Sequence, residues 1–279
     1  MAESNEQIAS AQVADQAEDT VATKVAVNEA DIAVEDRILP LVDGAAVTVV
    51  IGVIGAKGGV GTTTLGLGLA RHLAKAGRRV GYLDADIASP DAYFRLAEGR
   101  RFGMEGDNLL PLEPEANLQL MSFGGFMETP DEPMLWDSRL MAATALEFWG
   151  SALWRDRELV IVDLPTGGGD LPGQLLHRLP FKAVYLISTP DAQTLKRAEQ
   201  VRNYLDWNKV HCGGLLINVG LGRPEDGSPE VAATRMGLPL LDAVASFGTD
   251  AGTEDHWVAP LWQEAVETLI KSAAEDEKA

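Results

Sequence analysis

The chain has 279 residues, of which 46% are hydrophobic, and it carries a formal net charge of −19. This length and apolar content can bury one substantial core, so we expect one large domain rather than two small ones. The negative charge argues against a general affinity for nucleic acid or anionic membranes, because their phosphates would be repelled.

Residues 1–40 form an acidic segment without aromatic residues and without a sustained helical or strand period. Such a segment cannot bury enough apolar surface to offset the entropy lost on ordering, so we expect a mostly disordered tail. The favoured interpretation is a solvated tail without specific function, and the alternative is an arm that docks a partner. The segment has neither the basic start nor the apolar run of a secretory signal.

From Val47 onward, short β-branched runs alternate with helical patterns. Six runs are hydrophobic on both faces, as in a parallel sheet covered by helices. They are VTVVIGVIG (47–55), RVGYLDAD (79–86), LQLMSF (118–123), ELVIVDLP (158–165), AVYLISTP (183–190) and GLLINVG (214–220). Between the first two runs, residues 63–76 have the leucine spacing of a helix, and Gly77 ends it. The pattern predicts a doubly wound α/β fold, with a mostly parallel sheet flanked by helices and a ligand site at the carboxyl ends of the strands.

The C-terminal stretch PLWQEAVETLIKSAAEDEKA places Trp262, Val266, Leu269 and Ile270 on one helical face. Its polar face is acidic rather than basic, so a helix that packs on the core is favoured over one that seeks a membrane. The longest uncharged apolar run, residues 44–56, is too short to span a bilayer. We therefore expect no stable membrane insertion.

The stretch GAKGGVGTTT, Gly55 to Thr64, lies between an apolar strand and a helix, which is the context of a phosphate-binding loop. Its glycines let backbone N–H groups point inward, and the positive end of the following helix adds to them, so the loop can cradle an anion. Thr63 stands where a hydroxyl would bind Mg²⁺. Thr62 stands where such loops carry lysine, which raises the question of how the phosphates are neutralised.

Acidic residues follow two of the predicted strands. Asp84 and Asp86 end the second run, and Asp163 ends the apolar run ELVIV. Carboxylates at strand ends that face the loop can hold Mg²⁺ and orient an attacking water. A solvated turn is the alternative for Asp84 and Asp86. The glycines of PTGGGD, which follow Asp163, predict a mobile loop that senses the γ-phosphate, with a simple turn as the alternative. A dinucleotide fold is disfavoured because no G-x-G-x-x-G follows the first strand.

These motifs resemble those of a known family. AKGGVGTTT is similar to the deviant Walker A motif of MinD/ParA-class ATPases, with Lys57 at the position of the signature lysine. GYLDADIASPDAYF, LWRDRELVIVDLPTGGGD and AVYLISTPDAQTLKRA are most similar to the Mrp/ApbC branch, whereas the loop, with Ala56 and Thr62, looks like the TadZ/CpaE group. The resemblance covers Val47 to Val244 and implies a P-loop NTPase fold. The expected units are an acidic tail (1–40), an ATPase domain (41–272) and a charged C-terminal tail (273–279).

The resemblance also implies roles for single residues. Lys57 would reach the phosphates of the opposite subunit in a nucleotide-sandwich dimer, and Asp86 would position the attacking water, so these two are the expected catalytic residues. Thr63 would bind Mg²⁺, Asp163 would hold it through water, and Asn218 would contact adenine. Asp84 is expected to hold Mg²⁺ because of its place at a strand end. The expected nucleotide-binding set is Lys57, Gly58, Gly59, Val60, Gly61, Thr62, Thr63, Thr64 and Asn218.

Together these features predict a cytoplasmic, Mg²⁺-ATP-dependent dimeric switch that hydrolyses ATP slowly and controls an unidentified protein partner. The alternatives are a non-hydrolysing ATP-binding adaptor and an Mrp-type iron–sulfur cluster carrier. Mrp-type carriers have a Cys-x-x-Cys pair beyond the segment that matches INVG, where this chain reads GLGRPEDGSPEVAATRMG. The single cysteine, Cys212, provides no disulfide framework and no cluster site within one chain, and it fits a reducing compartment. The expected cofactors are ATP and Mg²⁺, without an iron–sulfur cluster.

Overall fold

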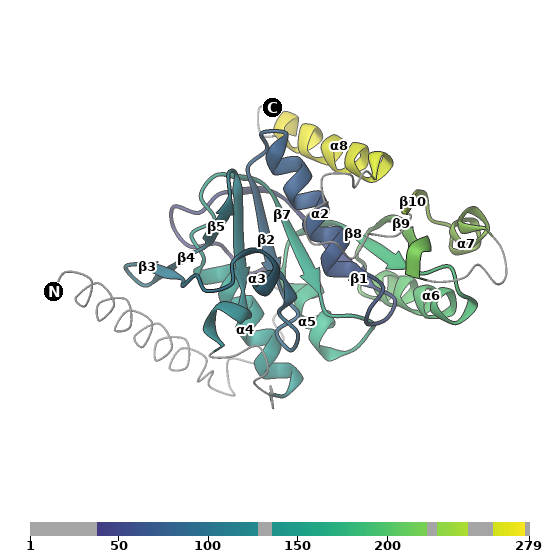
Figure 1. The fold of residues 1–279 in the computed structure, drawn as a ribbon, viewed down its shortest axis with the longest axis horizontal. Coiled ribbons are helices and arrows are strands. Elements are labelled where there is room, and N and C mark those ends of the chain that lie inside the picture. The colour runs from purple at the N-terminus through teal and green to yellow at the C-terminus, as the bar shows by residue number, and fades with distance from the viewer. Residues whose placement is uncertain (1–37, 128–135, 222–227, 245–258, 277–279) are drawn as a thin grey trace.

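A computed structural model describes residues 38–127, 136–221, 228–244 and 259–276. Its centre is an eight-stranded sheet in the order β10-β9-β8-β1-β7-β2-β6-β5, and β3 and β4 form a separate two-stranded sheet (Figure 1). The strands are β1 (Val47–Gly55), β2 (Val80–Asp84), β3 (Gly103–Glu105), β4 (Asn108–Leu110), β5 (Leu112–Glu115), β6 (Leu118–Ser122), β7 (Arg157–Leu164), β8 (Phe181–Ser188), β9 (Cys212–Asn218) and β10 (Leu240–Val244). The helices are α2 (Thr62–Lys75), α3 (Asp91–Leu96), α4 (Ser138–Ser151), α5 (Asp170–Arg178), α6 (Ala192–Trp207), α7 (Pro229–Met236) and α8 (Pro260–Asp276), with 3-10 helices η2 (Phe123–Phe126) and η3 (Val219–Leu221).

The predicted α/β fold is confirmed. In the eight-stranded sheet, neighbouring strands from β10 to β6 run parallel, and the edge strand β5 pairs antiparallel with β6. The separate pair of β3 and β4 is also antiparallel. The six predicted runs form β1, β2, β6, β7, β8 and β9. The prediction missed β3, β4, β5 and β10, because these short strands lie at the edges and lack a continuous apolar run that would mark them.

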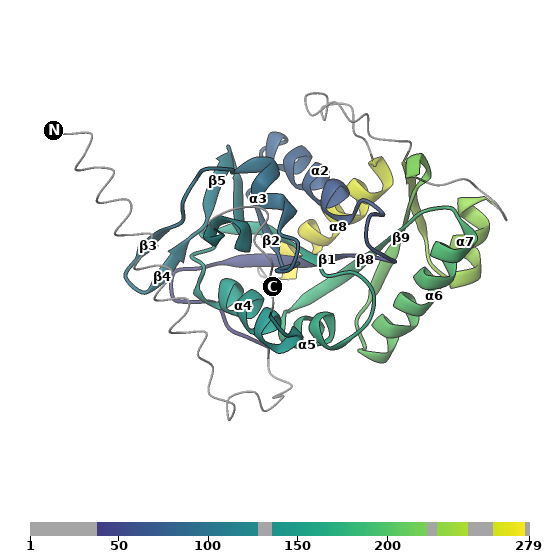
Figure 2. The ribbon, with the colours of Figure 1, turned by 60° about the horizontal axis from the view of Figure 1, so that its bottom comes forward.

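Helices cover both faces of the sheet. Figure 2 shows α2 and α8 on one face and α4 and α5 on the other. The predicted helix over 63–76 is α2, which begins one residue earlier than expected. Gly66 of α2 faces Tyr82 of β2 so closely that a Cβ there would lie 2.8 Å from the tyrosine hydroxyl. This helix therefore packs directly on the strand that carries Asp84.

The predicted packing role of the C-terminal helix is confirmed. Trp262, Val266 and Ile270 of α8 are buried in the core, and Leu269 packs against it. The Trp262 ring meets Tyr185 of β8 edge-on, with ring centroids 5.7 Å apart. Among the described residues, no helix is long and apolar enough to cross a membrane.

The expected N-terminal tail lies outside the described residues, except for its last three. Of these, Leu39 packs against the core, and its N–H donates to the carbonyl of Arg178 at 2.8 Å. The Trp149 indole donates back to the Leu39 carbonyl at 3.1 Å. At the other end, α8 continues through Asp276, so the first part of the expected charged tail is helical. The chain is thus anchored near residue 39.

The strand order places the predicted functional segments together. The parallel strands β9, β8, β1, β7 and β2 are consecutive neighbours, so their carboxyl ends share one edge of the sheet. The phosphate-binding loop leaves β1 at the middle of this edge. Asp163 and Asp84 end the strands on one side of it, and the segments after β8 and β9 lie on the other.

Candidate nucleotide-binding site

The loop from Gly55 to Gly61 joins β1 to α2 in the conformation that its glycines allow. Gly59 and Gly61 have φ angles of 80° and 96°, which residues with a side chain rarely adopt. Gly58 and Gly59 are exposed, whereas Val60 between the loop and the core is fully buried. The first N–H groups of α2 have no helical acceptor and lie at its positive end. The loop therefore offers exposed backbone beside the positive end of a helix, which suits an anion.

Thr62 turns inward beneath this loop. Its side chain is buried, and a Cβ at Gly55 would collide with its hydroxyl. The position that carries lysine in most such loops is therefore filled by a short, packed side chain. The loop itself supplies one cation, Lys57, which is half-buried.

Asn218 ties the end of β9 to the phosphate-binding loop. Its side-chain amide donates to the carbonyl of Val60 at 3.1 Å, and its side-chain oxygen accepts from the N–H of Gly220 at 3.2 Å. The residue is fully buried, and a Cβ at Gly61 would lie 2.8 Å from its amide nitrogen. In this structure its amide shapes the loop. A contact with adenine stays a prediction.

The structure brings the two strand-end carboxylates together. Asp84 and Asp163 are paired in the register between β2 and β7, and both are buried. One Asp84 oxygen accepts from Ser122 at 2.9 Å and from the Ala92 N–H at 3.1 Å. Its other oxygen is buried without a hydrogen-bond partner among the described residues. Burial first, and then the charge of Asp163, raises the pKa of Asp84 well above its ordinary value.

Asp163 accepts a hydrogen bond from the hydroxyl of Tyr82 at 3.0 Å and another from the Thr63 side chain. Burial is the main cause that raises its pKa to about 7, and the charge of Asp86 adds to the rise. Thr63 thus contacts the carboxylate with which it was predicted to share a metal. Asp86 itself is half-buried, and burial raises its pKa as well.

The paired carboxylates of Asp84 and Asp163 suit a divalent cation that also binds a nucleotide. Two buried carboxylates with raised pKa values and an unpartnered oxygen are stabilised when a cation neutralises them. Within the described ranges no three acidic, histidine or cysteine side chains gather to hold a metal on their own. Mg²⁺ usually binds one or two carboxylates and takes its other ligands from water and phosphates. The residues present therefore suit Mg²⁺ with a bound nucleotide.

Asp191, which the sequence analysis missed, lies near Lys57. It caps α6, where Thr194 donates to it from its N–H at 3.0 Å and from its hydroxyl at 2.8 Å, while Thr189 donates at 2.6 Å. Burial opposes ionisation, but these hydrogen bonds and the charge of Lys57 outweigh it and lower the pKa of Asp191 to about 2. Its position before a helix indicated a cap, but nothing in the sequence indicated its proximity to the loop.

The glycine-rich segment after β7 is tied to the phosphate-binding loop at one end and to α6 at the other. The N–H of Gly167 donates to the carbonyl of Gly55 at 3.1 Å. The hydroxyl of Tyr204 on α6 donates to the carbonyl of Gly169 at 2.5 Å. The segment therefore connects the phosphate-binding loop to α6. Its role as a γ-phosphate sensor stays a prediction.

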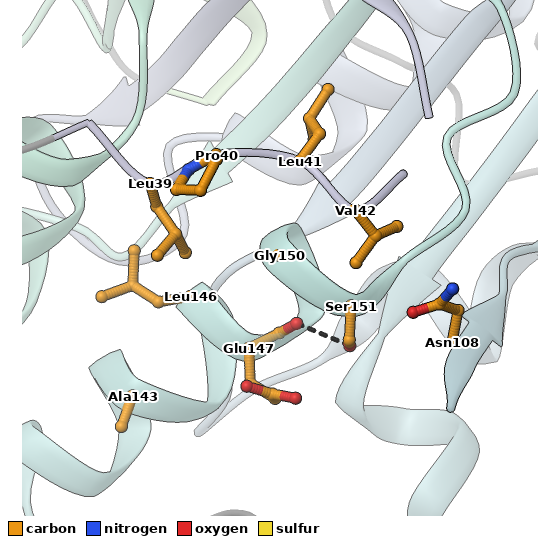
Figure 3. A pocket seen from close by; sticks show the side chains of 10 residues that line it. All are labelled: Leu39, Pro40, Leu41, Val42, Asn108, Ala143, Leu146, Glu147, Gly150 and Ser151. Atoms are coloured by element: carbon orange, nitrogen blue, oxygen red, sulfur yellow. Dashed lines mark hydrogen bonds between the residues drawn. The ribbon is translucent and has the colours of Figure 1, made fainter. Parts of the chain in front are cut away.

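A pocket lies elsewhere, between α4 and the segment that leads into β1. Figure 3 shows the Leu39 side chain directed toward Leu146 and that of Val42 directed toward Ser151. The lining is mainly apolar, and its charged member, Glu147, would repel a phosphate. This pocket is therefore no part of the nucleotide site.

Comparison with known proteins identifies related families. Residues 46–230 match the ParA family model described as NUBPL iron-transfer P-loop NTPase. An iron–sulfur cluster carrier protein from Bacillus subtilis is 32% identical over 79% of this chain and 68% of its own length. The corresponding protein from Pseudomonas fragi is 31% identical over 69% of this chain and 71% of its own length. Rat cytosolic Fe-S cluster assembly factor NUBP2 is 27% identical over 70% of this chain and 78% of its own length.

Solved structures share the fold. A nucleotide-binding protein from Archaeoglobus fulgidus in complex with ADP superposes with a TM-score of 0.59 and 22% identity, covering 81% of this chain and 89% of that one. The septum site-determining protein MinD from Pyrococcus horikoshii, complexed with Mg-ADP, superposes with a TM-score of 0.56 and 20% identity, covering 84% and 97%. The predicted resemblance to the MinD/ParA class and its Mrp branch is confirmed.

These relatives correct two expectations. The predicted partner-controlling switch is wrong, because the curated relatives are named iron–sulfur cluster carriers or assembly factors. The expectation of no iron–sulfur cluster is contradicted by the same names. It rested on the single cysteine and on the missing Cys-x-x-Cys pair, and these observations concern only the ligands that copies of this chain can supply.

Proposed function

The chain belongs to the ParA family of NUBPL-type iron-transfer P-loop NTPases, and we propose that it acts in iron–sulfur cluster transfer through a nucleotide-dependent step. The observation that carries the proposal is the family match over residues 46–230, which spans the phosphate-binding loop and both strand-end carboxylates. The rat relative's name favours a cytosolic setting.

The proposed nucleotide is ATP with Mg²⁺. The phosphates would lie on the loop N–H groups and the amino end of α2. Asp84, Asp163 and the Thr63 hydroxyl would hold the metal, because the acidic pair has a buried oxygen without a partner and Thr63 already contacts Asp163. When bound, Mg²⁺ would neutralise charge on the phosphates.

The family points to nucleotide hydrolysis, and we propose that this chain hydrolyses ATP slowly. Asp86 would orient the attacking water, and Lys57 would bring positive charge to the phosphates, within its own subunit or across a nucleotide-dependent homodimer. Asp191 carries the negative charge that lies near Lys57. Turnover would be slow because Thr62 places no cation against the β- and γ-phosphates, where charge develops in the transition state.

The iron–sulfur cluster would be the cargo of this chain. One copy of the chain does not have enough cysteines to hold a cluster by itself. Clusters are typically held by four thiolates, and each copy has one cysteine. Cys212 is buried, and burial raises the pKa of its thiol to about 11. It begins β9, roughly 20 Å along the strand from the nucleotide edge. We therefore propose that most thiolates that hold the cargo belong to the donor or acceptor protein.

A transfer assay tests this function. A cluster-loaded scaffold protein and an apo-ferredoxin are mixed anaerobically with the full chain, and ferredoxin reconstitution is followed by its visible absorbance. We expect faster transfer with the chain and Mg-ATP than with ADP, and loss of this gain in Asp163→Asn. Asp156→Asn, at the opposite end of β7, serves as the matched control. Equal rates with and without the chain, whichever nucleotide is present, would refute the proposal.

The raised pKa of Asp163 predicts how Mg²⁺ binding responds to pH. Below about pH 7 its carboxyl is protonated in the metal-free protein, and the proton must leave before the cation binds. We therefore expect the Mg²⁺-dependent gain in ADP affinity to fall by up to about tenfold per pH unit as the pH drops below 7. Calorimetric titrations of ADP with and without Mg²⁺ measure this gain. In Asp163→Asn the dependence should be weaker, and a flat wild-type profile would contradict the assignment.

A further inference from the structure

Arg95 of α3 places a guanidinium against the first turn of α2. Its Nη1 donates to the hydroxyl of Thr64 at 2.8 Å, and its Nη2 donates to Asp91 at 3.2 Å. Thr64 is the third residue of α2, directly after the residue predicted to bind Mg²⁺. Arg95 therefore stands at the amino end of the helix on which the phosphates are expected to lie.

The end of α2 at which Arg95 lies favours anions over cations. The amino end of a helix carries a partial positive charge, so a guanidinium there is repelled and an anion is attracted. The exposed ion pair with Asp91 offsets little of this repulsion, because side chains on the helix surface are screened by water. A phosphate between Arg95 and the α2 N–H groups would interact favourably with both.

The residues around the phosphate-binding loop provide little positive charge for a phosphate. Thr62 has no charge, and the negative charge of Asp191 partly offsets that of Lys57. On the other side lie Asp84 and Asp163, which repel an incoming phosphate.

The geometry of the side chain suits a phosphate ligand. An arginine has five N–H donors in a rigid fork, and the contacts to Thr64 and Asp91 orient this fork without using all of them. About two-fifths of the side chain is exposed, so a bound molecule can reach it. Its position is thus fixed before a nucleotide arrives.

We propose that Arg95 binds the phosphate chain of the nucleotide and supplies positive charge that the loop lacks at Thr62. This role rests on the proposed nucleotide-dependent function and assigns it a binding residue outside the phosphate-binding loop. Because Arg95 contacts Thr64 rather than the start of the loop, the phosphates concerned are those shared by ADP and ATP.

The test compares Arg95→Gln, Arg95→Lys and wild type in titrations with fluorescent mant-ADP and mant-ATP, with Mg²⁺, at low and high salt. Loss of a charge-assisted contact should weaken both probes by roughly tenfold or more at low salt and by less at high salt. Arg95→Lys should keep part of the affinity, since the charge remains. The control is Arg100→Gln, whose side chain instead donates to the Glu113 carbonyl at 2.7 Å.

The salt dependence and the melting temperature distinguish a phosphate ligand from an arginine that only supports the fold. An arginine that only supports the fold would lower the melting temperature together with affinity, and its loss would not depend on salt. Unchanged affinity in Arg95→Gln, beside normal binding by the wild type, would refute the role of Arg95 alone. A wild-type chain that bound neither probe would refute the nucleotide-dependent function itself, and this role with it.

Discussion

Replacing Asp163 with asparagine is expected to lower Mg²⁺-dependent ATP hydrolysis by roughly 10²–10³-fold, the usual effect of removing one preorganised electrostatic group from such a site. Asparagine keeps the shape of the side chain and can still accept from Tyr82, but it cannot neutralise a metal. Phosphate release at saturating Mg-ATP measures the loss.

The same substitution should make the metal-free protein more stable. Burial, the largest cause, raises the pKa of Asp163 to about 7, whereas an unfolded aspartate titrates near ~3.9. Between these values the folded chain binds more protons than the unfolded chain, so the wild type loses stability as the pH rises from about 4 to about 7. Asparagine has no charge to bury. We expect its free energy of unfolding to exceed that of the wild type by ~1 kcal/mol or more near pH 8 and to match it near pH 4.

Lower activity together with higher stability would distinguish loss of a metal ligand from misfolding. A variant that lost activity because it misfolded would be less stable at both pH values. Urea unfolding without Mg²⁺ measures the stability, and Asp156→Asn should change neither property, because Asp156 lies in an exposed turn with a φ of 51° that asparagine tolerates. If Asp163→Asn hydrolysed ATP at the wild-type rate, the proposed role of Asp163 in the metal site would be wrong.

The sequence predicted those parts of the site that lie at the carboxyl ends of parallel strands. Asp84, Asp163 and the phosphate-binding loop each follow an apolar run, and parallel strands bring their carboxyl ends to one edge. Their meeting was therefore predictable without knowing the strand order. The edge strands β3, β4, β5 and β10 could not be predicted in the same way, because short strands with one exposed side carry no continuous apolar signal.

Contacts between side chains from different strands and helices could not be read from the sequence. Asp191 shows only the pattern of a helix cap, and Arg95 that of an exposed arginine four residues after an acid. The proximity of Asp191 to Lys57 and the contact of Arg95 with Thr64 depend on where α6 and α3 pack. Asn218 illustrates the converse: its place after an apolar strand was informative, but its hydrogen bond to Val60 needed coordinates. The prediction about the iron–sulfur cluster was wrong because it considered only the cysteines that this chain itself carries.

The second large effect that we expect is a loss of stability when the core contacts of the C-terminal helix are removed. α8 lies beyond the residues that match the family model, yet it packs against β1, the strand that leads into the phosphate-binding loop. Trp262 is fully buried there, and its backbone N–H donates to Asp242 of β10 at 3.2 Å. Arg78, just after α2, donates to Glu267 of α8 at 2.5 Å and to Glu158 at 2.9 Å. If these contacts make α8 part of one cooperative domain over residues 41–272, damage to α8 must reach the nucleotide site.

Trp262→Ala should therefore lower the free energy of unfolding by about 3–5 kcal/mol, the cost of removing a large buried aromatic side chain and leaving a cavity. Trp207→Ala, at a residue that is 85% exposed, should change it little. Urea unfolding is followed by far-ultraviolet circular dichroism and by fluorescence of bound mant-ADP. In one cooperative domain both signals shift together to lower urea in Trp262→Ala. If instead nucleotide release kept its wild-type midpoint while part of the helical signal was lost earlier, α8 would be a separately melting appendage, and the ATPase domain would end before it.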